Sequence, residues 1–68
     1  MRIKLNTFLD VKEFVSICSN VPGEITLKQN KYVVDGKSIM GIFSLDLSNE
    51  LELLVDNSYE ENFEKFIV

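Results

Sequence analysis

The side chains that most often carry chemistry near neutral pH are scarce in this chain. There is no histidine, and the single cysteine is Cys18. Without an imidazole, neither a Ser-His-Asp site nor a Cys-His site can be assembled. One thiol forms no internal disulfide and no cysteine cluster for zinc. We therefore expect binding rather than catalysis, with no enzyme active site, no metal and no cofactor.

Acidic side chains are plentiful toward the end of the chain, at Asp56, Glu60, Glu61 and Glu64. Carboxylate oxygens are the ligands that Ca²⁺ and Mg²⁺ prefer. The spacing of these four residues, however, lacks the loop pattern of an EF-hand. It is typical of the solvated face of a helix, and that is the interpretation we adopt.

Length and charge narrow the classes of protein further. The 68 residues allow a single domain, 1–68, and carry a net charge of −4. A net negative charge argues against a nucleic-acid partner, which requires a basic face. No apolar run reaches the roughly 18 residues that span a bilayer, and no signal peptide is visible. We expect a cytoplasmic protein with no membrane or nucleic-acid partner.

Alternating apolar and polar residues predict four short strands, at residues 2–5, 24–28, 32–35 and 50–55. The second and third strands form a β-hairpin, whose two central residues are either Gln29-Asn30 or Asn30-Lys31. Both registers place the same four apolar side chains on one face, which we predict to be buried: Ile25, Leu27, Tyr32 and Val34.

Apolar residues at helical spacing predict a first helix between the first two strands, with Cys18 as a buried, unreactive thiol on its stripe. This helix begins either at Thr7 with Asp10, or at Asp10 with Glu13, because each pair fits a capping box. The apolar stripe of the helix consists of Val11, Phe14, Val15 and Cys18.

Two further helices are expected. The second spans residues 38–45, and the Ser38 side chain caps it by accepting the backbone N–H of Met40 or Gly41. The third is a short C-terminal helix that begins with a capping box of Ser58 and Glu61. Its predicted apolar stripe consists of Tyr59, Phe63, Phe66 and Ile67.

The order of these elements is β-α-β-β-α-β-α. Four strands with one apolar face each need a layer of helices on that face and tolerate water on the other. The sequence therefore predicts an α/β (α+β) fold, an open-faced two-layer sandwich.

Residues 37–45, KSIMGIFSL, resemble a nearly identical run in the HPr family, the small phosphocarriers of the bacterial sugar phosphotransferase system. In that family the run heads a short middle helix. The similarity continues backward without a gap through Asp35, Val34, Asn30 and residues 24–27, and forward through the fourth strand with one short gap. The resemblance covers nearly the whole chain and implies an HPr-like antiparallel sheet in the order 1-4-2-3, here with a shortened last helix.

The phosphoryl-accepting histidine of the family has no counterpart. Counting back without gaps places Thr7 at the histidine position, Leu9 at a following arginine and Asp10 at a proline. A threonine ester would be much less reactive, Leu9 cannot clamp phosphoryl oxygens, and the Asp10 carboxylate would repel them. We therefore expect a non-catalytic regulatory or protein-binding module. A phosphocarrier with a non-histidine acceptor such as Thr7 is one alternative.

The resemblance implies two roles for the second helix. Ser38 matches a serine that a dedicated ATP-dependent kinase phosphorylates in many Gram-positive members. The histidine-lacking catabolite-repression paralogue of the family works through this serine alone and is the nearest functional model. Ile39, Met40 and Phe43 match residues that dock onto partners in the family, whereas the other interpretation places them in the core.

The expected partners follow from the same resemblance. They are phosphotransferase-system or transcription-regulatory proteins, together with an HPr serine kinase. A structural or assembly module is the remaining alternative. Because small domains often gain stability by association, we also consider a homodimer that forms through the second or the third helix.

Overall fold

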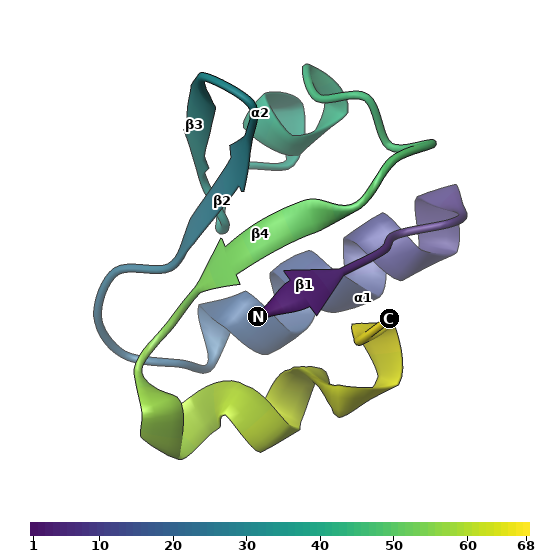
Figure 1. Cartoon of the computed structure of the whole chain (residues 1–68). Coiled ribbons are helices and arrows are strands. Elements are labelled where there is room, and N and C mark those ends of the chain that lie inside the picture. Colours follow the sequence, from purple (N-terminus) through teal and green to yellow (C-terminus); the bar gives the residue numbers. More distant parts are fainter.

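The computed structural model describes residues 1–68 as four strands and three helices (Figure 1). No helix in it is both long enough and apolar enough to cross a membrane. The order of the strands and helices along the chain is β1 (Arg2–Ile3), α1 (Phe8–Ser19), β2 (Thr26–Gln29), β3 (Tyr32–Asp35), α2 (Ile39–Phe43), β4 (Leu51–Leu54) and η1 (Asn57–Phe66).

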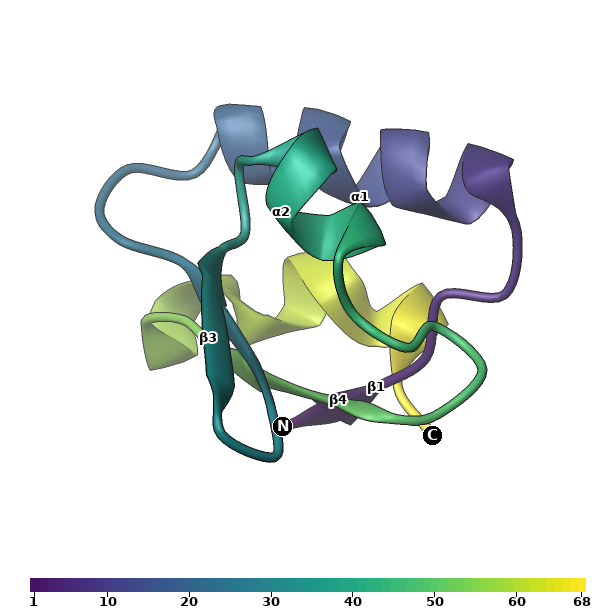
Figure 2. The same ribbon diagram turned by 90° about the horizontal axis from the view of Figure 1, so that it is seen from above.

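The four strands form one antiparallel sheet in the order β1-β4-β2-β3, as predicted. Leu27 of β2 is the central residue of this ladder, because it lies opposite Leu53 of β4 and Val34 of β3. At the β1 side, Ile3 lies opposite Leu51. Viewed from above, all three helices lie on one side of the sheet (Figure 2). The predicted layers are therefore confirmed.

The core lies between the sheet and the helices. Phe14 of α1 is its centre, with ring centroids 5.3 Å from Phe63 and 5.8 Å from Phe66. Cys18 is fully buried as predicted, and burial raises the pKa of its thiol to about 12. The buried apolar side chains are Ile3, Leu5, Val11, Phe14, Cys18, Val21, Ile25, Leu27, Ile42, Leu45, Leu51, Leu53, Phe63 and Phe66.

The hairpin between β2 and β3 turns at Asn30-Lys31, because Gln29 pairs with Tyr32. Asn30 has a φ of 55°, a left-handed conformation that asparagine tolerates better than most residues. The prediction that Tyr32 is buried was wrong, since its side chain is 58% exposed. Tyr32 adjoins the turn on an outer strand and is not part of the buried cluster.

Helix α1 begins at the first of the two predicted caps. The Thr7 hydroxyl accepts the Asp10 N–H (3.1 Å), and the Asp10 carboxylate accepts the Thr7 N–H (3.3 Å). This reciprocal pair is a complete capping box. The alternative start at Asp10 with Glu13 was wrong, and the Glu13 carboxylate instead pairs with the Lys65 ammonium of η1.

The last helix is present but differs from the prediction. It is a 3₁₀ helix, and its cap is Asp56, whose carboxylate accepts the Ser58 N–H (2.9 Å). The predicted Ser58 cap was therefore wrong, because the helix begins earlier and Asp56, two residues before Ser58, caps it. Ile67 lies beyond the helix and pairs with Ile3 of β1, so it does not continue the apolar stripe.

Candidate functional site

The candidate site lies where the first turn of α1 meets the short helix α2. Ser38 begins α2 as predicted: its hydroxyl accepts the Gly41 N–H at 3.1 Å. The preceding turn is fixed by Asp35, whose carboxylate accepts the Lys37 N–H (2.8 Å) and whose carbonyl accepts the Ser38 N–H (3.0 Å). Ser38 is half-buried and held in place by these bonds.

The apolar residues of α2 divide between core and surface. Ile42 is fully buried, whereas Met40 is 79% exposed and Phe43 is 43% exposed. Ile39 is partly buried against the core. Of the three predicted docking residues, Met40 and Phe43 are therefore available on the surface and Ile39 is only partly so. Helix α2 has only five residues, and the fold buries one of them, Ile42, and leaves other side chains of the helix exposed.

Phe8 is part of this surface and was missed by the sequence reasoning. Its ring stacks on that of Phe43, with centroids 5.6 Å apart and planes inclined by 13°. The Lys12 ammonium lies 5.7 Å from the centroid of the Phe8 ring, a cation–π arrangement. We call the surface formed by Phe8, Met40 and Phe43 the helix-end patch. The sequence did contain a sign of this residue's involvement, because Phe8 lies three residues before Val11 and extends the apolar stripe of α1 by one turn.

Thr7 lies next to this patch, directly before Phe8. Its hydroxyl is engaged as the cap of α1. The Asp10 carboxylate accepts the N–H groups of both Asn6 (2.9 Å) and Thr7 (3.3 Å), so a negative charge adjoins the hydroxyl. Leu9, in the same first turn of α1, is 71% exposed and supplies no cation.

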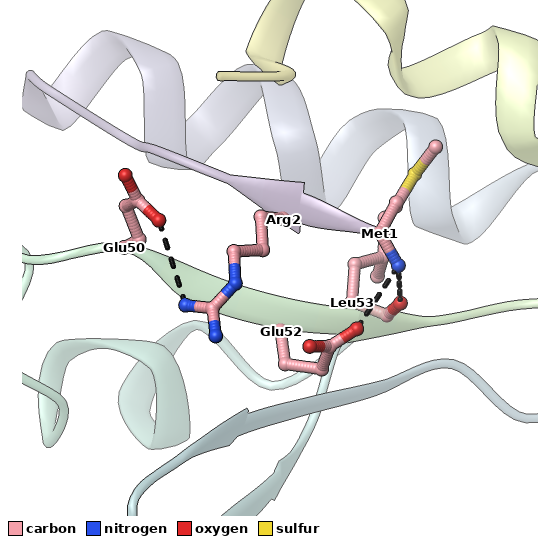
Figure 3. A network of polar contacts seen from close by, with 5 residues as sticks. All are labelled: Met1, Arg2, Glu50, Glu52 and Leu53. Atoms are coloured by element: carbon pink, nitrogen blue, oxygen red, sulfur yellow. Dashed lines mark hydrogen bonds and ion pairs between the residues drawn. The ribbon is translucent and has the colours of Figure 1, made fainter.

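The open face of the sheet is mostly polar, apart from the exposed Val33 and Leu54. A hollow of about 670 Å³ lies between residues of β1, β2 and β4 and the loop that precedes β4, and all ten of its lining residues are hydrophilic. Three of these lining residues form ion pairs: the Met1 ammonium donates to the Glu52 carboxylate (3.1 Å) and to the Leu53 carbonyl (3.0 Å), and Arg2 pairs with Glu50 at 3.5 Å (Figure 3). The hydrogen bond and charge of the Met1 ammonium lower the pKa of the Glu52 carboxyl.

Of the four acidic residues near the end of the chain, Asp56 has a structural role. Asp56 caps η1 through the Ser58 backbone and hydroxyl, and these two hydrogen bonds lower the pKa of its carboxyl. No three acidic, histidine or cysteine side chains gather into a group that could hold a metal ion.

Comparisons of the chain with protein-family models, curated proteins and solved structures found no match.

Proposed function

We propose that this chain is a histidine-lacking HPr-like protein that binds partner proteins through the helix-end patch and does not carry phosphoryl groups. The observation that carries the proposal is the stack of Phe8 on Phe43, with the exposed Met40 one turn away on α2. Exposed apolar groups that gather on a small domain mark interaction sites. A rigid aromatic pair and an adaptable methionine suit such a surface.

Two further features support the HPr-like assignment. The segment 37–45 carries the residues of the family's middle helix, and Ser38 caps α2 as that resemblance implies. The antiparallel sheet has the strand order 1-4-2-3 that the resemblance implies. A fold supports a family assignment without defining a function, so the docking role depends on the patch itself.

A phosphocarrier that uses Thr7 is the weaker candidate, because the Asp10 carboxylate, which accepts the Thr7 N–H, would repel an incoming phosphate. Incubation with phosphoenolpyruvate and enzyme I tests this candidate. We expect the intact mass of the chain to stay unchanged, and a phosphorylated species would contradict the non-carrier proposal.

Phosphorylation of Ser38 is the proposed control of docking. A phosphate there would add about −1.5 to −2 charges directly beside Ile39 and Met40 and so change the charge of the docking surface. With ATP and an HPr serine kinase, we expect one phosphate on the wild type and none on Ser38→Ala. An unmodified wild type would contradict this part of the proposal.

The docking proposal is tested by titrating the isotope-labelled chain with a transcription regulator that binds HPr-family proteins. We expect NMR shifts confined to the first turn of α1 and to α2, with binding weakened about tenfold or more by Met40→Ser. Leu54→Ser is the matched control, because Leu54 is also exposed but lies on β4. Shifts elsewhere, or equal affinities for both variants, would refute the assignment of this patch.

A further inference from the structure

Strand β3 is the open edge of the sheet. The order β1-β4-β2-β3 leaves β1 and β3 outermost, and the end of the chain covers β1. There, the Lys4 N–H donates to the Phe66 carbonyl (2.9 Å) and the Val68 N–H donates to the Arg2 carbonyl (3.3 Å). β3 pairs with β2 alone, so the molecule presents one uncovered strand.

Val33 supplies the free backbone groups of this edge. The Gly36 N–H donates to the carbonyl of Ile25, the residue directly before β2, at 2.8 Å. The backbone N–H of Gly36 therefore points toward the β2 side. Backbone groups in an antiparallel pair alternate between inward and outward from residue to residue. The N–H and C=O of Val33 therefore point away from β2. The Val33 side chain is 61% exposed, and no strand other than β2 pairs with β3.

The charges along β3 are complementary to those of a second β3. Val33 and Asp35 are alternate residues of β3 and share one face of it, whereas Lys31 lies in the turn directly before the strand, two residues from Val33. If two β3 strands pair antiparallel about Val33, each Lys31 lies opposite the Asp35 of the other copy. Val33 then lies opposite Val33. Opposite-charge and β-branched cross-strand pairs both stabilise such pairing.

We propose that the chain forms a symmetric homodimer through its β3 edges, which doubles the four-stranded sheet into one continuous sheet. The two Val33 residues exchange a pair of N–H···O=C bonds, and two Lys31–Asp35 ion pairs flank them. Because β3 has four residues, the interface is small and dimerisation depends on concentration. The self-association expected from the sequence is thereby assigned to a strand rather than to a helix.

Sedimentation velocity over a concentration series tests the dimer. Val33→Pro removes the outward N–H but no hydrogen bond to β2, and an edge strand tolerates it. Lys31→Glu places two carboxylates opposite each other. We expect each variant to weaken dimerisation by about tenfold or more. In Lys31→Glu/Asp35→Asn, the asparagine still accepts the Lys37 N–H while the repulsion disappears, so much of the association should return.

Two controls separate this interface from other surfaces. Leu54→Ser on the open face of the sheet and Met40→Ser on the helix-end patch should dimerise like the wild type, and circular dichroism should show that every variant is folded. A wild type that stays monomeric at the highest concentration would overturn the proposal. A dimer that survives Lys31→Glu, or that Met40→Ser dissociates, would also overturn it.

Discussion

The rings of Phe8 and Phe43 lie nearly parallel, 13° apart in plane and 5.6 Å between centroids, although they belong to different helices. This stack joins the first turn of α1 to the last residue of α2. Both rings are also partly exposed, Phe8 by 58% and Phe43 by 43%. The same contact therefore orients α2 and provides the surface proposed to receive a partner.

Truncating one ring of this stack should destabilise the fold. We expect Phe8→Ala to lower the free energy of unfolding by about 1 kcal/mol, because the aromatic pair is lost. Urea denaturation measures this change. Leu9→Ala is the control, since an exposed side chain without such a partner should change stability by less than about 0.5 kcal/mol. Equal effects of the two variants would show that the stack contributes nothing to stability.

Removal of the Thr7 cap should also be measurable. Thr7→Ala takes away the oxygen that accepts the Asp10 N–H, so we expect a loss of about 1 kcal/mol in unfolding free energy. Thr7→Ser keeps an oxygen at this position and should recover most of the loss. Thermal and urea unfolding provide the comparison. If serine and alanine behave alike, the capping box is not what stabilises this end of α1.

Stability should fall in acid because of Asp56. Hydrogen bonds from the Ser58 hydroxyl and backbone lower the pKa of the folded Asp56 carboxyl below its unfolded value. The stabilisation from this group is therefore complete above about pH 4, and it is lost as the pH falls through the lower folded value. Urea midpoints measured from pH 6 to pH 2 should show a shallower decline for Asp56→Asn. An identical decline would assign the acid sensitivity to other carboxyls.

Gly36 should tolerate no side chain. A Cβ built at Gly36 would lie 2.7 Å from Cγ2 of Ile25, a buried core residue. We expect Gly36→Ala to cost about 1–3 kcal/mol through overpacking. A double-mutant cycle with Ile25→Ala checks the cause, since the pair should cost less than the sum of its members. Additive costs would mean that contact with Ile25 is not responsible.

Cys18 should resist thiol reagents in the folded chain. Burial raises the pKa of its thiol to about 12, so almost no thiolate forms at pH 8, and the sulfur is inaccessible. Mass spectrometry after incubation with iodoacetamide should show no label, whereas the same treatment in urea should give complete labelling. Rapid labelling of the native protein would indicate frequent opening of α1.

The order of elements was predictable because the local signals agree with the tertiary structure. The alternation at Leu51 and Leu53 fits β4, and the spacing of Val11 and Phe14 fits α1. The hairpin register was left open, because asparagine at either central position suits a tight turn. Only the pairing of Gln29 with Tyr32 decides it.

The site was less predictable than the fold. Exposure of Phe8 depends on where α2 packs, which is a tertiary fact that the local pattern does not contain. Met40 and Phe43 were predicted from the HPr resemblance, whereas helical spacing alone was equally compatible with a core position. The 3₁₀ geometry of η1 was also hidden, because Phe63 and Phe66 are three residues apart and fit either helical period.

The bridge between Ile3 and Ile67 brings the two ends of the chain to one edge of the sheet. A short flexible linker from Val68 to Met1 would therefore cyclise the backbone with little change to β1, and new ends could be opened at the Asn30-Lys31 turn. Cyclisation converts the Met1 ammonium into an uncharged amide. The circular chain would thus report how much the amino-terminal charge beside Glu52 contributes while β1 stays in register.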